Sequence, residues 1–335
     1  MKNQKITFIA CTLLICILCT HARKNDLLKQ YPHVTLSNGI VRMSVFLPDP
    51  EKGFYRSTRF EWSGMIYELS CGGHSYFLQR NERNPLPLRQ DHDPLKSDNA
   101  AGLPDQFQDG PERETHEKTA VIIGVGSVDI ATGMIVDPGE WKTTSGKTWV
   151  EFTHNLKDTN GYAYSYTKRM ELTPDKPELV ISYSLSNTGV RTISCQQYNH
   201  NFFTIDDEYV GKYYEVELSF QPKFRTFHPE EFREKQSFLP YATISKNKII
   251  LLEDIDVKGG IFSIVEGFGD GVSHHHGIIR NKKTGACVDI RGDLPLSEFH
   301  FWADDITFCP EFFVAVSVEP GQSQQWKRVY TFYEE

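Results

Sequence analysis

The chain has 335 residues and a formal net charge of −8, from 36 Lys and Arg against 44 Asp and Glu. An acidic chain without a basic stripe argues against nucleic acid as a partner. The length is enough to bury a large hydrophobic core in one big β domain or in two smaller ones.

The N-terminus has the pattern of a secretory leader. A basic start and an apolar run, Ile6–Cys19, precede the small-x-small site Thr20-His21-Ala22. The sequence therefore predicts a signal peptide over residues 1–22, a single mature domain over residues 23–335, and export to the periplasm or the extracellular space. A lipid anchor on Cys19 is disfavoured because a bulky leucine precedes it. No later apolar run is long enough to cross a membrane.

The remaining cysteines do not predict a metal site. After the leader the chain has Cys71, Cys195, Cys287 and Cys309, and no two of them have CxxC spacing. A zinc site is therefore not expected. An oxidising compartment permits disulfides, but four widely spaced cysteines in a large domain do not require them.

Short alternating segments separated by turn residues dominate the chain. They predict an all-β fold, a large antiparallel β-sandwich with few short helices. We expect helical turns around Asp26–Tyr31, Pro229–Gln236 and Ser297–Ala303. The expected strands are Val41–Phe46, Met65–Ser70, Thr119–Val125, Thr148–His154, Tyr162–Leu172, Leu179–Leu185, Ile249–Leu252, Phe262–Val265, Ala286–Ile290 and Phe312–Val318.

One segment, Asn84–His116, breaks this pattern with five prolines, many charges and no periodicity. Long structureless segments inside compact domains are uncommon and are often functional. We interpret it as a lid or rim over the open face of the sandwich, and His92 within it as a candidate substrate-binding residue. A solvated surface loop is the equally weighted alternative.

The stretch Gln197–Asp206, QYNHNFFTID, predicts a binding site. His200 lies between Asn199 and Asn201, and two phenylalanines follow. Amides are poor choices for a strand interior. Aromatic faces beside a few placed polar groups are typical of sites that bind sugars. A hydrogen-bonded histidine near a strand end is the alternative.

A carboxylate lies near the start of a late strand. Pro310 is tolerated only at a strand start or edge, so Glu311 is expected at the mouth of the strand, beside Phe312 and Phe313. Partial desolvation there would raise the pKa of Glu311 and strengthen it as a base. A salt-bridged structural glutamate is the alternative.

Two other segments carry polar candidates. In Tyr55–Gly64, Arg59 could hold a sugar hydroxyl and Trp62 could stack on a ring, although an ordinary strand with an ion pair fits as well. In Gly267–His276, Asp270 is a turn residue between glycines. The three consecutive histidines that end this segment would point to opposite faces of a strand, so no metal is expected there.

Together these segments resemble the galactose mutarotase-like (aldose 1-epimerase) superfamily. Asn199–Phe203 matches its Asn-His-x-aromatic-Phe stretch, and Phe308–Glu311 matches its Phe-Cys-x-Glu stretch. Asp270, before the Thr284-Gly285 turn, loosely matches its aspartate segment. The N-terminal RSTRFEWSG segment resembles a secreted bacterial subgroup. The His-Gly-Gly stretch of the family is absent, and His74 follows two glycines in reversed order.

The resemblance implies a galactose mutarotase-like supersandwich and an aldose 1-epimerase that needs no cofactor and no metal. Glu311 would act as the base and His200 as the acid on a monosaccharide or oligosaccharide. Two alternatives stay open: a polysaccharide lyase-like or other glycan-processing enzyme, and a non-catalytic carbohydrate-binding protein. The sequence leaves open whether the chain is a monomer or a dimer. The residues expected to contact the sugar are Asp270, Arg59, Asn199, Trp62 and His92.

Overall fold

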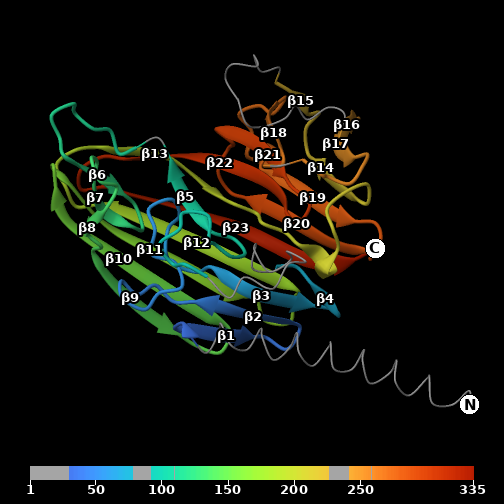
Figure 1. The fold of residues 1–335 in the computed structure, drawn as a ribbon, viewed down its shortest axis with the longest axis horizontal. Helices are drawn as coiled ribbons and strands as arrows, with labels where there is room; N and C mark the ends of the chain where they lie inside the picture. The colour runs from blue at the N-terminus through green and yellow to red at the C-terminus, as the bar shows by residue number, and fades with distance from the viewer. Residues whose placement is uncertain (1–29, 78–91, 109, 226–240, 258) are drawn as a thin grey trace, which may run out of the picture.

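The computed structural model describes residues 30–77, 92–108, 110–225, 241–257 and 259–335, which form antiparallel sheets (Figure 1). The all-β prediction is confirmed. The signal peptide expected over residues 1–22 lies outside the described residues. Within the described ranges, no helix has both the length and the apolar character needed to span a bilayer.

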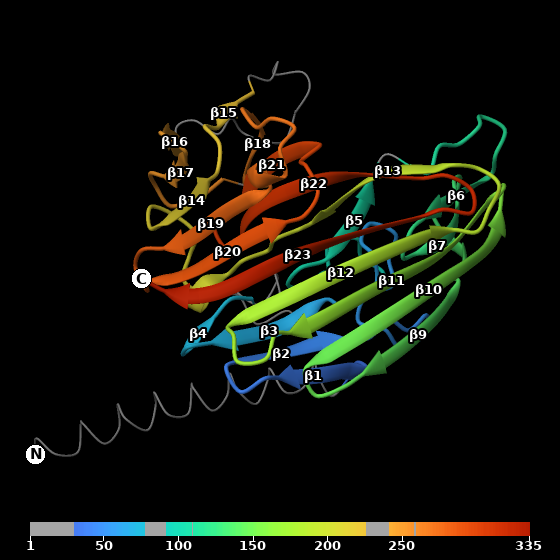
Figure 2. The same cartoon turned by 180° about the vertical axis from the view of Figure 1, so that it is seen from behind.

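A ten-stranded sheet forms one layer of the sandwich (Figure 2). In spatial order its strands are β16 (Ala242–Ser245), β17 (Lys248–Leu251), β14 (Tyr214–Leu218), β19 (His276–Asn281), β20 (Ala286–Gly292), β23 (Ser323–Glu334), β12 (Glu178–Asn187), β11 (Tyr162–Leu172), β10 (Trp149–Thr159) and β9 (Glu140–Ser145).

Two smaller sheets lie against the same core, and a third, short sheet contributes Val121 to it. The six-stranded sheet consists of β15 (Lys223–Phe224), β18 (Ile261–Glu266), β21 (Glu298–Ala303), β22 (Phe308–Val318), β13 (Ile193–Asn199) and β5 (Asp105–Gln108). The four-stranded sheet consists of β1 (His33–Ser37), β2 (Val41–Phe46), β3 (Ile66–Cys71) and β4 (His74–Ser75). The third consists of β6 (Thr119–Ile122), β7 (Gly126–Asp129) and β8 (Ile135–Asp137), and the short 3₁₀ helices are η1 (Ile205–Asp207) and η2 (Val272–His274).

The turn chemistry explains the longest hairpin. Asn160 and Gly161 join β10 to β11 and have φ values of 55° and 82°. Asparagine and glycine tolerate this left-handed region, which is why such pairs close tight hairpins. Strands β2 and β11 have the bounds that the sequence predicts.

The helical turn expected at Ser297–Ala303 is wrong, because this segment is strand β21. Its side chains alternate: Phe299 and Phe301 are fully buried in the main core, whereas His300 between them is partly exposed. That period of two is a strand period. The other two expected helical turns fall largely or wholly outside the described residues.

The long segment that the sequence left without structure contains β5, an edge strand of the six-stranded sheet. Strand β5 pairs antiparallel with β13 through Gln106↔Tyr198 and Asp105↔Asn199. This part of the segment is therefore neither a lid nor a solvated loop. Residues 84–91 and 109 of the same segment lie outside the described ranges.

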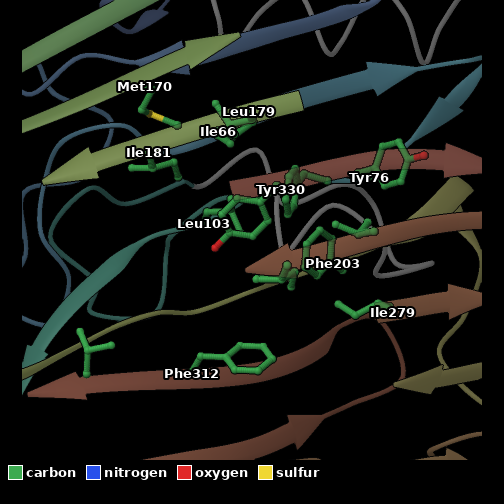
Figure 3. Close-up of a cluster of buried hydrophobic side chains, with 14 of the residues drawn as sticks. Ile66, Tyr76, Leu103, Met170, Leu179, Ile181, Phe203, Ile279, Phe312 and Tyr330 are labelled. Atoms are coloured by element: carbon green, nitrogen blue, oxygen red, sulfur yellow. The ribbon is translucent and has the colours of Figure 1, made fainter. Parts of the chain in front are cut away.

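The main core lies between the ten-stranded sheet and the two smaller sheets (Figure 3). Ile181 and Tyr330 come from the large sheet, Phe312 from β22 and Ile66 from β3. A second cluster lies on the other face of the six-stranded sheet. There Phe60 and Trp62 of the N-terminal half pack with Phe202, Trp302 and Cys309. The cysteines at 71, 195, 287 and 309 are all buried and free.

A buried ion cluster ties the two layers together. Lys168 Nζ on β11 lies 2.5 Å from Asp105 Oδ2 on β5 and 3.0 Å from Glu61 Oε2, and all three side chains are fully buried. Burial raises the pKa of Glu61 to about 7, against the attraction of Lys168. The cluster fixes β5 over the ten-stranded sheet. Because β5 also carries Gln106, which faces His200, the cluster helps to hold the surroundings of His200 in place.

We expect Lys168→Met to cost about 3–5 kcal/mol of unfolding free energy, because it leaves two carboxylates buried without their cation. Urea denaturation followed by circular dichroism measures the cost. The matched control is Lys157→Met, which removes an exposed ion pair with Glu140. Its cost should stay below about 1 kcal/mol. Equal midpoints for the two variants would contradict a stabilising role for the cluster.

Candidate active site

A pocket of about 580 Å³ opens on the face of the six-stranded sheet that is turned away from the ten-stranded sheet. Its floor comes from alternate residues of β5, β13, β18, β21 and β22, and part of its wall comes from the N-terminal half of the chain. The lining residues are Arg59, Asp98, Gln106, Gln108, Tyr198, His200, Phe202, Gly259, Phe262, Ile264, Glu298, His300, Trp302 and Glu311.

Strand register brings the ionisable side chains together. Strands β21 and β22 pair His300 with Glu311. Strands β13 and β22 pair as far as Gln197↔Val314, and the same register resumes at the bridge Phe203↔Phe308. The same register, continued three residues past that pair, places His200 beside Glu311. Pro310 has no N–H to offer a neighbouring strand, and its carbonyl accepts a hydrogen bond from the Asn201 side chain where the backbone pairing is interrupted.

His200 and Glu311 form a buried ion pair. His200 Nδ1 lies 2.7 Å from Glu311 Oε1, and the two side chains are 4% and 7% exposed. Burial alone would raise the pKa of Glu311, but the charge of His200 and the hydrogen bond from its ring outweigh burial and lower that pKa. The raised pKa expected from the apolar neighbours is therefore wrong, because the sequence did not show the imidazole partner.

The other ring nitrogen of His200 also has an acceptor. Nε2 lies 2.8 Å from Gln106 Oε1, and the Tyr198 hydroxyl donates to the same oxygen over 3.0 Å. With a carboxylate on one side and an amide oxygen on the other, both ring nitrogens act as donors. The arrangement therefore favours His200 as an imidazolium, which is the form that can give up a proton.

Three ligand atoms at this site could hold a metal. Those of His200, Cys309 and Glu311 lie within 4.8 Å of one another. His200 Nδ1 and Glu311 Oε1 already face each other at hydrogen-bond distance, so an ion would have to separate them. The three consecutive histidines do not converge: His275 is buried and stacks on Phe312, whereas His276 faces Asp289.

Of the residues expected to contact the sugar, Arg59 lines the pocket. Its guanidinium is paired with Asp98 and lies 4.7 Å from the centre of the Phe60 ring. Trp62 does not line the pocket: it is 3% exposed, and its indole N–H donates to the Ser57 carbonyl.

His92 does not line the pocket either. Its ring stacks on Phe54 at 4.0 Å, and its Nε2 lies 2.7 Å from the Phe54 carbonyl oxygen. Burial lowers the pKa of His92 and so favours the neutral ring. His74, the other histidine of the N-terminal half considered from the sequence, lies 2.8 Å from Asp206 and is also absent from the lining.

Asn199 and Asp270 lie elsewhere as well. Asn199 faces the core side of β13, where its amide donates to Asp105 and Tyr183. The alternation of the strand explains this, because neighbours of His200 point away from it. Asp270 is exposed before η2 and is absent from the pocket lining.

The sequence did not single out several residues that line the pocket: Gln106, Tyr198, Glu298, His300 and Trp302. A signal for the last three exists in the alternation of Glu298–Trp302, EFHFW, where polar or amphipathic side chains take every second position. Gln106 had no such signal, because it lies in the proline-rich segment.

Several solved structures have a similar fold, and each of the three named below matches 90% of this chain. They include a galactose mutarotase related enzyme from Lactobacillus acidophilus (12% identity, TM-score 0.56, 97% of that chain) and a galactose mutarotase-like protein from Lactobacillus casei (11%, 0.56, 100%). A putative aldose 1-epimerase from Escherichia coli K12 follows (13%, 0.53, 99%). No protein-family model and no curated protein sequence matches.

The chain therefore has the fold of these galactose mutarotase-like structures, as the sequence predicted. At these identities the likeness concerns the fold alone. The chemistry of the site must be argued from the pocket of this chain.

The lowered pKa of Glu311 predicts a pH dependence. Ionised Glu311 contributes stability above its ordinary pKa of 4.5, and this contribution is lost as the pH falls through the lowered folded value. If Glu311 is the base, the acid limb of kcat/KM for anomer exchange should lie below pH 4.5. Polarimetry at a series of pH values measures it. An acid limb above pH 5 that is absent from Glu311→Gln would contradict the prediction.

Proposed function

We propose that this protein is an aldose 1-epimerase that interconverts the anomers of a free, uncharged sugar. The observation that carries the proposal is the buried His200–Glu311 ion pair at the pocket floor, 2.7 Å apart. A base and an acid held side by side are what ring opening and closing at one carbon require.

The reaction needs two proton transfers. A Glu311 carboxylate oxygen takes the proton of the anomeric hydroxyl, and His200 gives a proton to the ring oxygen. The bond between C1 and the ring oxygen breaks, the open-chain aldehyde turns about C1–C2, and closure on the other face reverses both transfers. The ring oxygen takes the place of the Gln106 amide oxygen as the partner of His200 Nε2.

The remaining lining fits a pyranose ring. Phe202, Phe262 and Trp302 offer apolar faces for C–H groups, and Gln106 and Gln108 offer amides for hydroxyls. A volume of about 580 Å³ is within the range of small-molecule sites. Since the ion pair is closed, the sugar would lie against it rather than between its two members.

We expect Glu311→Gln to lower kcat for mutarotation by at least about 100-fold, because a positioned base contributes that much. Polarimetry of freshly dissolved α-anomers of D-glucose, D-galactose, D-mannose and D-xylose measures the rate. The matched control is Glu151→Gln, which changes a carboxylate of β10 paired with Arg169 outside the pocket. Equal rates for wild type and Glu311→Gln would remove Glu311 from the mechanism.

The charges of the pocket favour an uncharged substrate over the uronic acids of a polysaccharide lyase. Glu298 and Glu311 are carboxylates, each within 2.7 Å of a histidine. The one arginine in the described lining, Arg59, is already paired with Asp98. A sugar carboxylate would meet like charges and displace an existing partner.

We therefore expect D-galacturonate to bind at least about 10-fold more weakly than D-galactose, since a 1.4 kcal/mol penalty gives that factor. Isothermal titration calorimetry of both sugars in one buffer measures the difference. Tighter binding of the uronate, with unsaturated products released from a polyuronate, would favour the lyase alternative instead.

A further inference from the structure

The pocket contains a second imidazole, His300, directly across the strand ladder from Glu311. His300 and Glu311 are register partners on β21 and β22, so their side chains leave the same face of the sheet side by side. The His300 side chain is 11% exposed and lines the pocket. Its ring lies between those of Phe262, at 5.4 Å, and Phe313, at 4.3 Å.

Glu298 holds the His300 ring in place. Its Oε2 lies 2.7 Å from His300 Nε2, and its Oε1 accepts a hydrogen bond from Gln196 Nε2 over 3.0 Å. Gln196 in turn accepts a hydrogen bond from the Ser297 hydroxyl over 3.1 Å. A carboxylate fixed in this way sets the orientation of the imidazole and places a proton on Nε2.

The two imidazoles of the pocket differ in how many of their ring nitrogens face a protein acceptor. Both ring nitrogens of His200 face protein acceptors, Glu311 and Gln106. His300 uses Nε2 for Glu298, and its Nδ1 has no hydrogen-bond partner among the residues that the structure describes. With the proton held on Nε2, Nδ1 of the neutral ring is an acceptor for a hydroxyl.

We propose that His300 contacts the sugar directly through Nδ1, accepting a hydrogen bond from a hydroxyl, and that Glu298 is the residue that positions it. The inference deepens the proposed function and rests on its pocket being the sugar site. A site that hydrogen-bonds a hydroxyl selects sugars that carry a hydroxyl at that ring position. His300 and Glu298 therefore also contribute to the choice among aldoses.

The test is sugar binding to the full chain, measured by calorimetry with D-glucose, D-galactose, D-mannose and D-xylose. His300→Asn should weaken binding of the best sugar by about 10-fold. Glu298→Ala should weaken it similarly, because the ring loses its orientation. Glu298→Gln keeps an oxygen acceptor for Nε2 and should restore binding to within about threefold of wild type.

The matched control is His276→Asn. His276 forms an imidazole–carboxylate pair with Asp289 at 3.3 Å on β19 and β20, outside the pocket. It should leave binding unchanged. Far-ultraviolet circular dichroism and the melting temperature show whether each variant folds, and His300→Gln serves if His300→Asn does not.

Unchanged binding in a folded His300 variant would overturn the inference, as would Glu298→Gln binding as weakly as Glu298→Ala. Failure of the proposed function looks different: wild type would bind sugar, His300→Asn would weaken that binding, and anomer exchange would stay at the buffer rate. If wild type bound none of the four sugars, that result would contradict both the inference about His300 and the proposed function.

Discussion

The register of strand β22 with its two neighbours is the constraint on which the site depends. It aligns Glu311 with His300 on β21 and with His200, which lies just past the end of β13, and Pro310 lies where the pairing with the β13 segment is interrupted. A slip of one residue in β22 would turn Glu311 toward the core and bring Phe312 out of it. The hydrophobic contacts of Phe312 therefore also hold the Glu311 carboxylate on the pocket face.

Because side chains alternate along β5 and β13, this part of the sheet has polar side chains on both faces, one toward the core and one toward the pocket. Asp105 and Asn199 point to the core side, where Asp105 meets Lys168, and Gln106 and His200 point to the pocket. Buried charge is costly unless it is paired, so the core face needs its lysine. The ion cluster therefore holds the floor of the pocket from behind.

The ionisable side chains of the pocket face one another in pairs. Each of its two histidines faces a glutamate, and its arginine faces an aspartate. The pairing lowers the pKa of Glu311 and keeps that carboxylate ionised despite its burial. A ligand that brings no charge of its own leaves these pairs intact, whereas an anion would break one of them. The charge pattern thus favours a neutral sugar more directly than the fold does.

The sequence by itself determined the all-β class, the bounds of strands β2 and β11 with the Asn160-Gly161 turn, and the two segments that carry His200 and Glu311. Alternation and turn residues are local properties, and both segments have unusual polar residues beside aromatic ones. It misread Ser297–Ala303 as a helical turn and the Gln106 segment as structureless. Only the tertiary structure decided which side chains meet, because register and facing are set by pairing between distant strands. That is why Asn199, adjacent to His200, lies outside the pocket and His300, a hundred residues on, lies inside it.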